Sequence, residues 1–337
     1  MNTFKALPTN QSSTATDVSV ATATRYRGRF APSPTGPLHF GSLIAAVGSY
    51  LDARAHCGEW LVRIEDIDAP RTVPGAADHI LRTLEGFGFE WDGDVVYQSR
   101  RLDLYHAALV RLQLAGLAYP CSCSRSEIAA SASRPSIDGG LLYPGTCRGG
   151  LRDGAAARAW RLRVPDREFL FHDRIQGKVR QNLERDVGDF VLLRADRQFA
   201  YQLAVVVDDA DQGVNAVVRG ADLLDSTLRQ VWLQQCLGVA KPNYAHVPVA
   251  VNAAGEKLSK QTKAMAVDPT EGLALLCRVM RFLGQAEYPD GTGGSLRDFW
   301  RWAVASWDLA RVPSLRSASV AGNGCCQPKD SRADNAA

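Results

Sequence analysis

The sequence predicts an α/β fold built on a doubly wound parallel sheet, interrupted by one insertion. Apolar strand-like runs alternate with segments of helical periodicity, an alternation typical of parallel sheets with helices on both faces. A buried strand at Trp60–Ile64 runs directly into Glu65-Asp66-Ile67-Asp68, which places acids where parallel strands deliver ligand-binding residues. The alternation breaks between residues 119 and 197, which we interpret as an insertion between two halves of the sheet domain.

The elements follow in order from these patterns. Apolar residues at helical spacing, from Leu38 to Leu51, predict a helix over Leu38–His56, and Gly58 ends it. The near-continuous apolar run at Phe199–Val207 is interpreted as a buried strand. Besides these, we expect strands at Tyr26–Ala31, Val95–Tyr97, Val217–Val218 and His246–Val251, and helices at Ala76–Phe87, Leu102–Leu117, Leu224–Leu237, Gly272–Leu283 and Leu296–Trp307.

Composition sets the limits of the folded part. Residues 1–24 are rich in Ser, Thr, Ala and Asn and lack the apolar core of a secretory signal, so we expect a disordered leader. No run of eighteen apolar residues occurs, and a cytoplasmic protein without a membrane partner is expected. The predicted units are the leader, the first half of the sheet domain at 25–118, the insertion at 119–197, the second half at 198–263, a helical region at 264–312 and a disordered tail at 313–337.

The net charge of +3 is unevenly distributed. Between Arg148 and Arg197 there are 12 Lys and Arg against 8 Asp and Glu, so the rest of the chain is close to neutral. A local basic excess is compatible with binding a polyanion such as RNA. A surface of paired charges explains the same surplus about equally well.

Two distant stretches indicate a nucleotide site. Pro32, Pro34 and Gly36 form a rigid turn that leads into a helix with His39 and Gly41 at its start, where backbone amides can hold a phosphate. Two hundred residues later, a polar loop carries Lys257 and Lys260, which could neutralise charge on a phosphate. No P-loop signature is present, which favours adenylyl transfer at the α-phosphate over γ-phosphoryl transfer.

The acidic and basic residues at strand ends suggest a second subsite. Arg29 and Arg219 are expected to end strands that border one crevice, with Glu65 at the end of a third. Guanidinium groups suit carboxylates because they bond them bidentately. The alternative is that the arginines simply pair with acids of the chain, for which Asp66, Asp68 and Asp222 are available.

These motifs resemble a known family. Arg29-Phe-Ala-Pro-Ser-Pro-Thr-Gly-x-Leu-His39-x-Gly41 and Lys257-Leu-Ser-Lys260 resemble the HIGH-like and KMSKS-like signatures of class I aminoacyl-tRNA synthetases of the glutamyl branch. The similarity covers roughly residues 26–312 and includes Leu61–Asp68, Ala204–Asp209 and Val218–Asp222. It is closer to the short paralogues of the branch, which the chain also matches in having Ser42 at the fourth HIGH position and the loop Lys-Leu-Ser-Lys-Gln.

The resemblance implies a Rossmann-like sheet and an ATP-dependent ligase that forms glutamyl-adenylate. The implied partners are L-glutamate, ATP with Mg²⁺ and tRNA(Asp) bearing queuosine in its anticodon loop, whereas DNA is not expected. His39 and Lys260 would be catalytic. The implied ATP-binding residues are His39, Gly41, Lys257 and Lys260, and the implied glutamate-binding residues are Arg29, Phe30, Ala31, Pro32, Ser33, Glu65, Tyr201 and Arg219.

Three cysteines in the insertion predict a structural zinc ion. Cys121, Cys123 and Cys147 lie within a short span, and a structural zinc site needs a fourth ligand. The sequence offers His172 and Tyr143 for that position, and the resemblance points to Tyr143. The alternative is a group of buried thiols without a metal.

Other functions stay open at this point. A truncated glutamyl-tRNA synthetase would share the catalytic residues but charge the 3′ end of a tRNA. A small-molecule nucleotidylyltransferase would use the same HIGH-like chemistry without needing the cysteine insertion. A non-catalytic RNA-binding protein would not need both His39 and Lys260.

Overall fold

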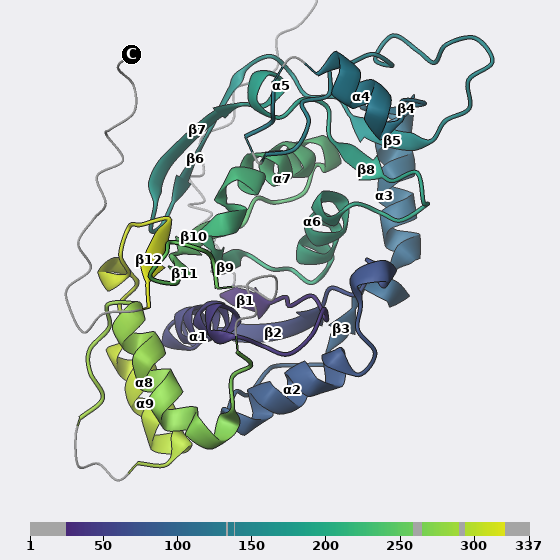
Figure 1. The fold of residues 1–337 in the computed structure, drawn as a ribbon. Coiled ribbons are helices and arrows are strands. Elements are labelled where there is room, and N and C mark those ends of the chain that lie inside the picture. Colours follow the sequence, from purple (N-terminus) through teal and green to yellow (C-terminus); the bar gives the residue numbers. More distant parts are fainter. Residues whose placement is uncertain (1–24, 133, 138, 259–264, 290–293, 321–337) are drawn as a thin grey trace, which may run out of the picture.

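Parallel strands form the centre of the molecule (Figure 1). The computed structural model describes residues 25–132, 134–137, 139–258, 265–289 and 294–320. Strand β1 (Arg27–Phe30) pairs in parallel with β2 (Glu59–Ile64), and β2 with β3 (Val96–Tyr97). Strands β9 (Ala216–Gly220) and β10 (Asn243–Val247) form a second parallel pair. The two groups meet where Asn215 accepts from the Arg27 amide at 2.9 Å and donates to its carbonyl at 3.1 Å.

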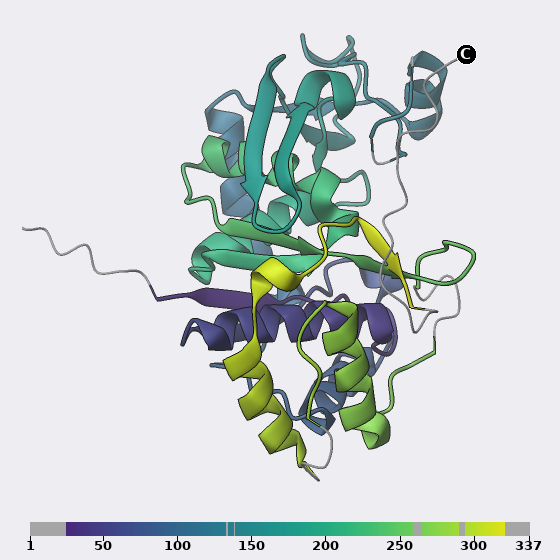
Figure 2. The ribbon, with the colours of Figure 1, turned by 90° about the vertical axis from the view of Figure 1, so that its left-hand side faces the viewer.

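Helices cover both faces of these strands (Figure 2). Helix α1 (Phe40–Ala55) packs against strands of both groups and shares one apolar core with α2 (Ala76–Gly86), α8 (Gly272–Phe282) and α9 (Leu296–Ser306). On the other face, α3 (Leu102–Leu114), α6 (Tyr201–Asp211) and α7 (Leu224–Leu237) form a second core. The predicted parallel α/β architecture is confirmed. Short 3-10 turns occupy Ala69–Arg71, Gln98–Arg100, Ala221–Leu223, Pro269–Glu271 and Leu309–Arg311.

The predicted strand at Phe199–Val207 is wrong, because this segment lies largely in helix α6. The helix is covered by α3, α7 and the strand β8 (Val191–Leu193), so Leu203–Val206 are all buried. A helix that is buried on most of its circumference has the same uninterrupted apolar run as a buried strand. As a consequence, Tyr201 enters the site from the first turn of a helix rather than from a strand.

The insertion contains an antiparallel sheet and a separate hairpin. Strands β4 (Ala118–Cys121), β5 (Ala159–Leu162) and β8 form the sheet. The hairpin is made by β6 (Glu168–Asp173) and β7 (Gly177–Asn182), and β6 packs against β10 of the central sheet. Two short helices, α4 (Arg125–Ser131) and α5 (Leu183–Asp186), complete the segment.

Much of the basic surplus of the insertion is paired within the protein. Arg148 contacts Asp189 at 2.6 Å and Glu184 at 2.7 Å, and Arg194 contacts Asp196 at 2.7 Å. Further ion pairs join Arg180 to Glu168, Arg185 to Asp186 and Arg174 to Asp52. These contacts favour the interpretation of the charge surplus as a surface of paired charges.

The segment after Pro313 was predicted to be a disordered tail, and its first part is not. Strand β12 (Ser317–Ser319) pairs in parallel with β11 (Val249–Val251), and Ala318 is buried between them and the core. Short polar and small residues carry little apolar signal, so only the backbone pairing reveals this strand. The predicted leader at 1–24 and the rest of the tail, 321–337, lie outside the described residues. Within the described ranges, none of the helices has the length and apolar character required to cross a membrane.

Candidate active site

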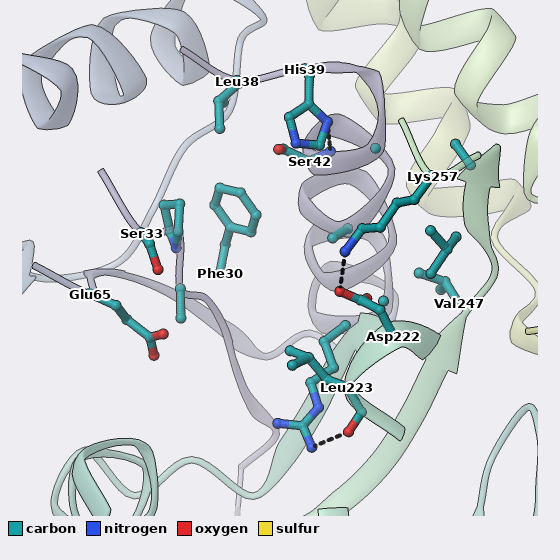
Figure 3. Close-up of a pocket in the computed structure, with 18 of the residues that line it drawn as sticks. Phe30, Ser33, Leu38, His39, Ser42, Glu65, Asp222, Leu223, Val247 and Lys257 are labelled. Atoms are coloured by element: carbon teal, nitrogen blue, oxygen red, sulfur yellow. Dashed lines mark hydrogen bonds and ion pairs between the residues drawn. The ribbon is translucent and has the colours of Figure 1, made fainter. Parts of the chain in front are cut away.

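A cavity of about 590 Å³ opens at the carboxyl ends of β1, β2 and β9 (Figure 3). Its walls include the predicted nucleotide residues His39, Gly41 and Lys257. They also include every residue predicted to contact an amino acid, namely Arg29, Phe30, Ala31, Pro32, Ser33, Glu65, Tyr201 and Arg219. The volume suits a small-molecule ligand. Lys260, predicted as catalytic, lies outside the described residues.

His39 caps the helix that points at this cavity. Its backbone precedes α1 in an extended conformation, and its Nδ1 accepts a hydrogen bond from the Ser42 amide at 3.2 Å. Because Nδ1 accepts, a neutral imidazole carries its proton on Nε2. The first turn of α1 contains no acidic residue, which leaves its positive end available to an anion. Ser42, which occupies the position of the second histidine of the HIGH-like motif, therefore orients His39 through its backbone.

The lysine loop lies against the same turn. A Cβ atom on Gly41 would come within 3.1 Å of the His39 ring and 3.3 Å of the Leu258 carbonyl oxygen, so a side chain here would crowd both. Downstream of the loop, Ala266 bridges His39, and the Val267 amide donates to the Leu38 carbonyl at 3.0 Å. The two motifs predicted as halves of one site are thus in direct contact.

Lys257 pairs with Asp222, one of the acids that were possible partners of Arg29 and Arg219. Its ammonium nitrogen lies 2.6 Å from Asp222 Oδ2, on the wall of the cavity opposite Glu65 (Figure 3). Both side chains are partly exposed, so the pair can rearrange at modest cost. Lys257 is consequently held beside the helix end where a phosphate would bind.

A buried network of charges lies behind the floor of the cavity, which Arg29 and Glu65 line. Arg29 Nε lies 3.2 Å from Asp209 Oδ1, and Arg63 bridges Asp209 at 2.8 Å and Glu65 at 3.3 Å. Arg63 is fully buried and also lies 3.7 Å from Asp208, which accepts from Gln98, Arg101 and Tyr105. Arg29 thus pairs with an acid, as the alternative interpretation anticipated, although the acid is Asp209 rather than Asp66 or Asp68.

Burial and neighbouring charges act in opposite directions on these carboxyl groups. Burial raises the pKa of Glu65 above its usual range, although Arg63 and Arg29 oppose that effect. Burial also acts to raise the pKa of Asp209, but Arg29 and Arg63 outweigh it and hold that pKa below the usual range. Burial raises the pKa of the Tyr201 phenol, which stays neutral. The floor therefore offers a fixed Arg29 and an acid whose charge a ligand ammonium would stabilise.

Arg219 is held differently from Arg29. Its Nε donates to His246 Nε2 at 3.0 Å and its Nη2 to Thr227 Oγ1 at 2.8 Å. The guanidinium also lies over the Tyr244 ring, 5.3 Å from its centroid. Among the residues that the structure describes, Arg219 forms no ion pair with a carboxylate, so its charge stays available to a ligand.

The three cysteines of the insertion converge as predicted. The sulfur atoms of Cys121, Cys123 and Cys147 lie within 4.8 Å of one another, and the Tyr143 hydroxyl lies 3.4 Å from Cys121 Sγ. A zinc–sulfur distance of about 2.3 Å places ligand sulfurs roughly 3.8 Å apart in a tetrahedron, so this spacing suits zinc. Burial raises the pKa of the Cys147 thiol, but hydrogen bonds from Tyr143 and Ser122 outweigh it and lower that pKa to about 6. His172 is not part of the group and lies exposed on β6.

Comparison with known proteins identifies the family to which the chain belongs. The family model described as "tRNA synthetases class I (E and Q), catalytic domain" matches residues 25–273. A glutamyl-Q tRNA(Asp) synthetase from Dechloromonas aromatica is 66% identical over 86% of this chain and 96% of its own length. The protein of the same name from Chromobacterium violaceum is 62% identical over the same shares. The chain belongs to the glutamyl-Q tRNA(Asp) synthetase family, within the class I synthetases.

Solved structures agree with this family. A glutamate tRNA ligase from Elizabethkingia meningosepticum, crystallised with its amino acid, superimposes with a TM-score of 0.73 at 25% identity. The match covers 88% of this chain and 67% of the ligase. The glutamate-tRNA synthetase of Elizabethkingia anophelis gives the same score and identity, with 68% of its chain covered. The fold expected from the resemblance, that of a class I catalytic domain, is confirmed.

Several residues of the site were not predicted from the sequence. Arg63 was only part of a quoted motif, although a charged residue inside an apolar strand is itself a signal of a buried ionic partner. His246, in the middle of β10, carries the same kind of signal. Asp173 carried no such signal, because it lies in the insertion and its partner, His246, is 73 residues away.

Proposed function

We propose that this chain activates L-glutamate with ATP and transfers the glutamyl group to queuosine in the anticodon loop of tRNA(Asp). The glutamyl-Q tRNA(Asp) synthetases that match 86% of this chain support this acceptor. The observation that carries the activation step is a shared cavity in which Arg29, Glu65 and Arg219 adjoin the His39 turn and Lys257. Because tRNA is the acceptor, we expect the enzyme to work in the cytoplasm.

Glutamate would bind on the floor of the cavity. The two carboxylates of the substrate need guanidinium partners and its ammonium needs an acid, which Arg29, Arg219 and Glu65 supply. Tyr201 and the backbone from Arg29 to Ser33 complete the proposed pocket. The fixed position of Arg29 against Asp209 reduces the entropy lost when the substrate binds.

ATP would place its phosphates at the start of α1. The glutamate α-carboxylate oxygen attacks the α-phosphorus, a new carbon–oxygen–phosphorus linkage forms, and the bond to the bridging oxygen breaks so that pyrophosphate leaves. His39 can donate from Nε2 to the phosphate, while Lys257 and Lys260 would balance the charge of the leaving group. Mg²⁺ supplies additional charge neutralisation on the phosphates when it accompanies ATP. Acyl transfer to queuosine then releases AMP.

An acceptor assay tests this function. Labelled glutamate is offered with queuosine-containing tRNA(Asp), with queuosine-lacking tRNA(Asp) and with tRNA(Glu). We expect label only on the queuosine-containing tRNA(Asp), and ribonuclease cleavage should place it in the anticodon-loop fragment rather than on the 3′-terminal nucleotide. Label on the 3′-terminal nucleotide of tRNA(Glu) would instead identify a truncated glutamyl-tRNA synthetase.

We further propose a structural zinc ion held by Cys121, Cys123, Tyr143 and Cys147. The donor set fits, since three thiols and a phenol converge and Cys147 has a lowered pKa. The four groups tie the end of β4 to the loop around residue 145, two segments that meet in a small apolar cluster. The ion would contribute rigidity to the insertion rather than chemistry to the cavity.

Cys121→Ser should release the metal and affect RNA transfer more than glutamate activation. Elemental analysis should find about one zinc per wild-type chain and much less in the variant, since loss of one thiolate weakens a four-ligand site. Pyrophosphate exchange should stay near normal while transfer to tRNA falls. Cys277→Ser, which replaces a thiol on α8 outside the cluster, is the control. Unchanged zinc in Cys121→Ser would contradict the ligand set.

A further inference from the structure

A buried chain of three side chains connects the insertion to the cavity. Asp173 at the end of β6 lies 2.6 Å from His246 Nδ1, and His246 Nε2 lies 3.0 Å from Arg219 Nε. Asp173 and His246 are fully buried, and Arg219 is only 5% exposed. Each residue comes from a different strand, β6, β10 and β9, so the chain crosses from the inserted hairpin into the central sheet.

One proton arrangement satisfies the donors and acceptors along this chain best, with the Thr227 hydroxyl also 3.1 Å from His246 Nε2. An arginine Nε–H can only donate, so His246 Nε2 must accept, and the imidazole proton must lie on Nδ1. Nδ1–H then donates to Asp173, which also accepts from the backbone amides of Ile175 at 3.0 Å and Gln176 at 2.8 Å. Burial and the nearby Arg219 hold the pKa of His246 at about 4 despite Asp173, so the imidazole is neutral at pH 7.

A neutral acceptor has a particular consequence for Arg219. Asp209 orients Arg29 and also neutralises it, whereas His246 orients Arg219 without supplying a negative charge in contact with it. The other acceptors, Thr227 Oγ1 and the Leu223 carbonyl, are neutral as well. Arg219 Nη1 is buried and has no hydrogen-bond partner among the described residues, and leaving such a donor unpaired is costly. A substrate carboxylate would supply the missing acceptor and the missing charge.

We propose that His246 is a positioning residue for glutamate binding, and that Asp173 fixes the His246 tautomer that orients Arg219. This inference rests on the proposed function in one respect, the contact of Arg219 with glutamate. It adds that the inserted hairpin takes part in building the amino-acid site. Gln176, just after Asp173, supports the arrangement by donating to the His246 carbonyl at 2.8 Å.

Asp173→Asn tests the tautomer directly. The asparagine oxygen can still accept from the amides of Ile175 and Gln176, but its NH₂ group faces His246 Nδ1 and forces the proton to Nε2. Two N–H groups then oppose each other at Arg219. We expect the KM for glutamate in pyrophosphate exchange to rise about 10- to 100-fold, as for loss of a hydrogen bond to a charged group, with the KM for ATP within about twofold.

Two controls separate this effect from loosening of the hairpin. Asp52→Asn weakens the contact of another fully buried aspartate with Arg174, the residue next to Asp173, without touching His246. It should lower the melting temperature but leave the KM for glutamate unchanged. His246→Gln can place an amide oxygen near Arg219, whereas His246→Leu cannot. The glutamine variant should therefore retain a lower KM for glutamate than the leucine variant.

Nitrogen-15 NMR of the histidine rings gives a measurement that needs no variant to fold. Wild-type His246 should be a neutral Nδ1–H tautomer at pH 7, and finding Nε2–H or an imidazolium would overturn the proposal. Arg219→Lys tests the underlying function. If it leaves the KM for glutamate unchanged, the assignment of Arg219 to the substrate is wrong. If it raises that KM while Asp173→Asn does not, the substrate site stands and the positioning role of His246 and Asp173 is wrong.

Discussion

Gly41→Ala should lower the kcat of glutamate-dependent pyrophosphate exchange by about 10-fold, because its neighbours must shift by a few tenths of an ångström and a misplacement of about 1 Å at a reacting centre can cost about 100-fold. The added Cβ would lie 3.1 Å from the His39 ring and 3.3 Å from the Leu258 carbonyl oxygen. One of the two must move, which separates the capping histidine from the lysine loop. Thermal unfolding should change little, because alanine is tolerated in a helix at least as well as glycine.

Gly48→Ala is the matched control for this prediction. Gly48 lies in the same helix, but a Cβ there would meet Val247 at 3.5 Å and Val218 at 3.6 Å, which is ordinary contact. This variant should keep near-normal exchange and gain stability of up to about 1 kcal/mol. If Gly41→Ala and Gly48→Ala have the same kcat, close approach at Gly41 is not what brings the two motifs together.

Arg63→Met should destabilise the protein by about 3–5 kcal/mol, the cost of leaving a buried charge without its partner. Arg63 contacts Asp209 at 2.8 Å and Glu65 at 3.3 Å, and these carboxylates cannot reach solvent easily. Without Arg63 the pKa of Glu65 should rise further, and the neutral acid would bind a substrate ammonium poorly. Urea unfolding and the KM for glutamate measure the two effects.

Arg101→Met provides the comparison for Arg63. Arg101 also pairs with Asp208, at 2.7 Å, but its side chain is 17% exposed and its other partner, Asp211, lies at the surface. Its loss should cost less stability and leave the KM for glutamate near the wild-type value. Equal destabilisation by the two substitutions would mean that the floor of the cavity is not organised around Arg63.

The sequence was most informative where a local pattern has one structural solution. The helix at Leu224–Leu237 has the predicted bounds, and the Pro-Gly turn with His39 leads into a helix as expected. The convergence of Cys121, Cys123, Tyr143 and Cys147 followed from spacing and family resemblance. The apolar run that became α6 failed because uniform burial erases the periodicity that distinguishes a helix from a strand.

Ion-pair partners that lie far apart in the sequence could not be predicted from it. Arg29 had several acids available, and only the packing of α6 against the sheet selects Asp209, 180 residues away. The pairing of Asp173 with His246 likewise depends on how the β6–β7 hairpin packs against β10. Charge pairing of this kind depends on distance in space, and a single sequence carries no record of it.

The short strand β12 has a consequence for how far the catalytic unit extends along the chain. It lies beside β11, and the chain leaving β11 leads directly to Lys257, while the Val320 amide donates to the Val251 carbonyl at 3.0 Å. The lysine loop therefore begins at the end of a two-stranded parallel sheet, β11 with β12. Strand β12 lies about sixty residues after Lys257 in the sequence. A version of the protein shortened to residue 312, where the helical region was expected to end, would keep every site residue and lose the support beneath one of them.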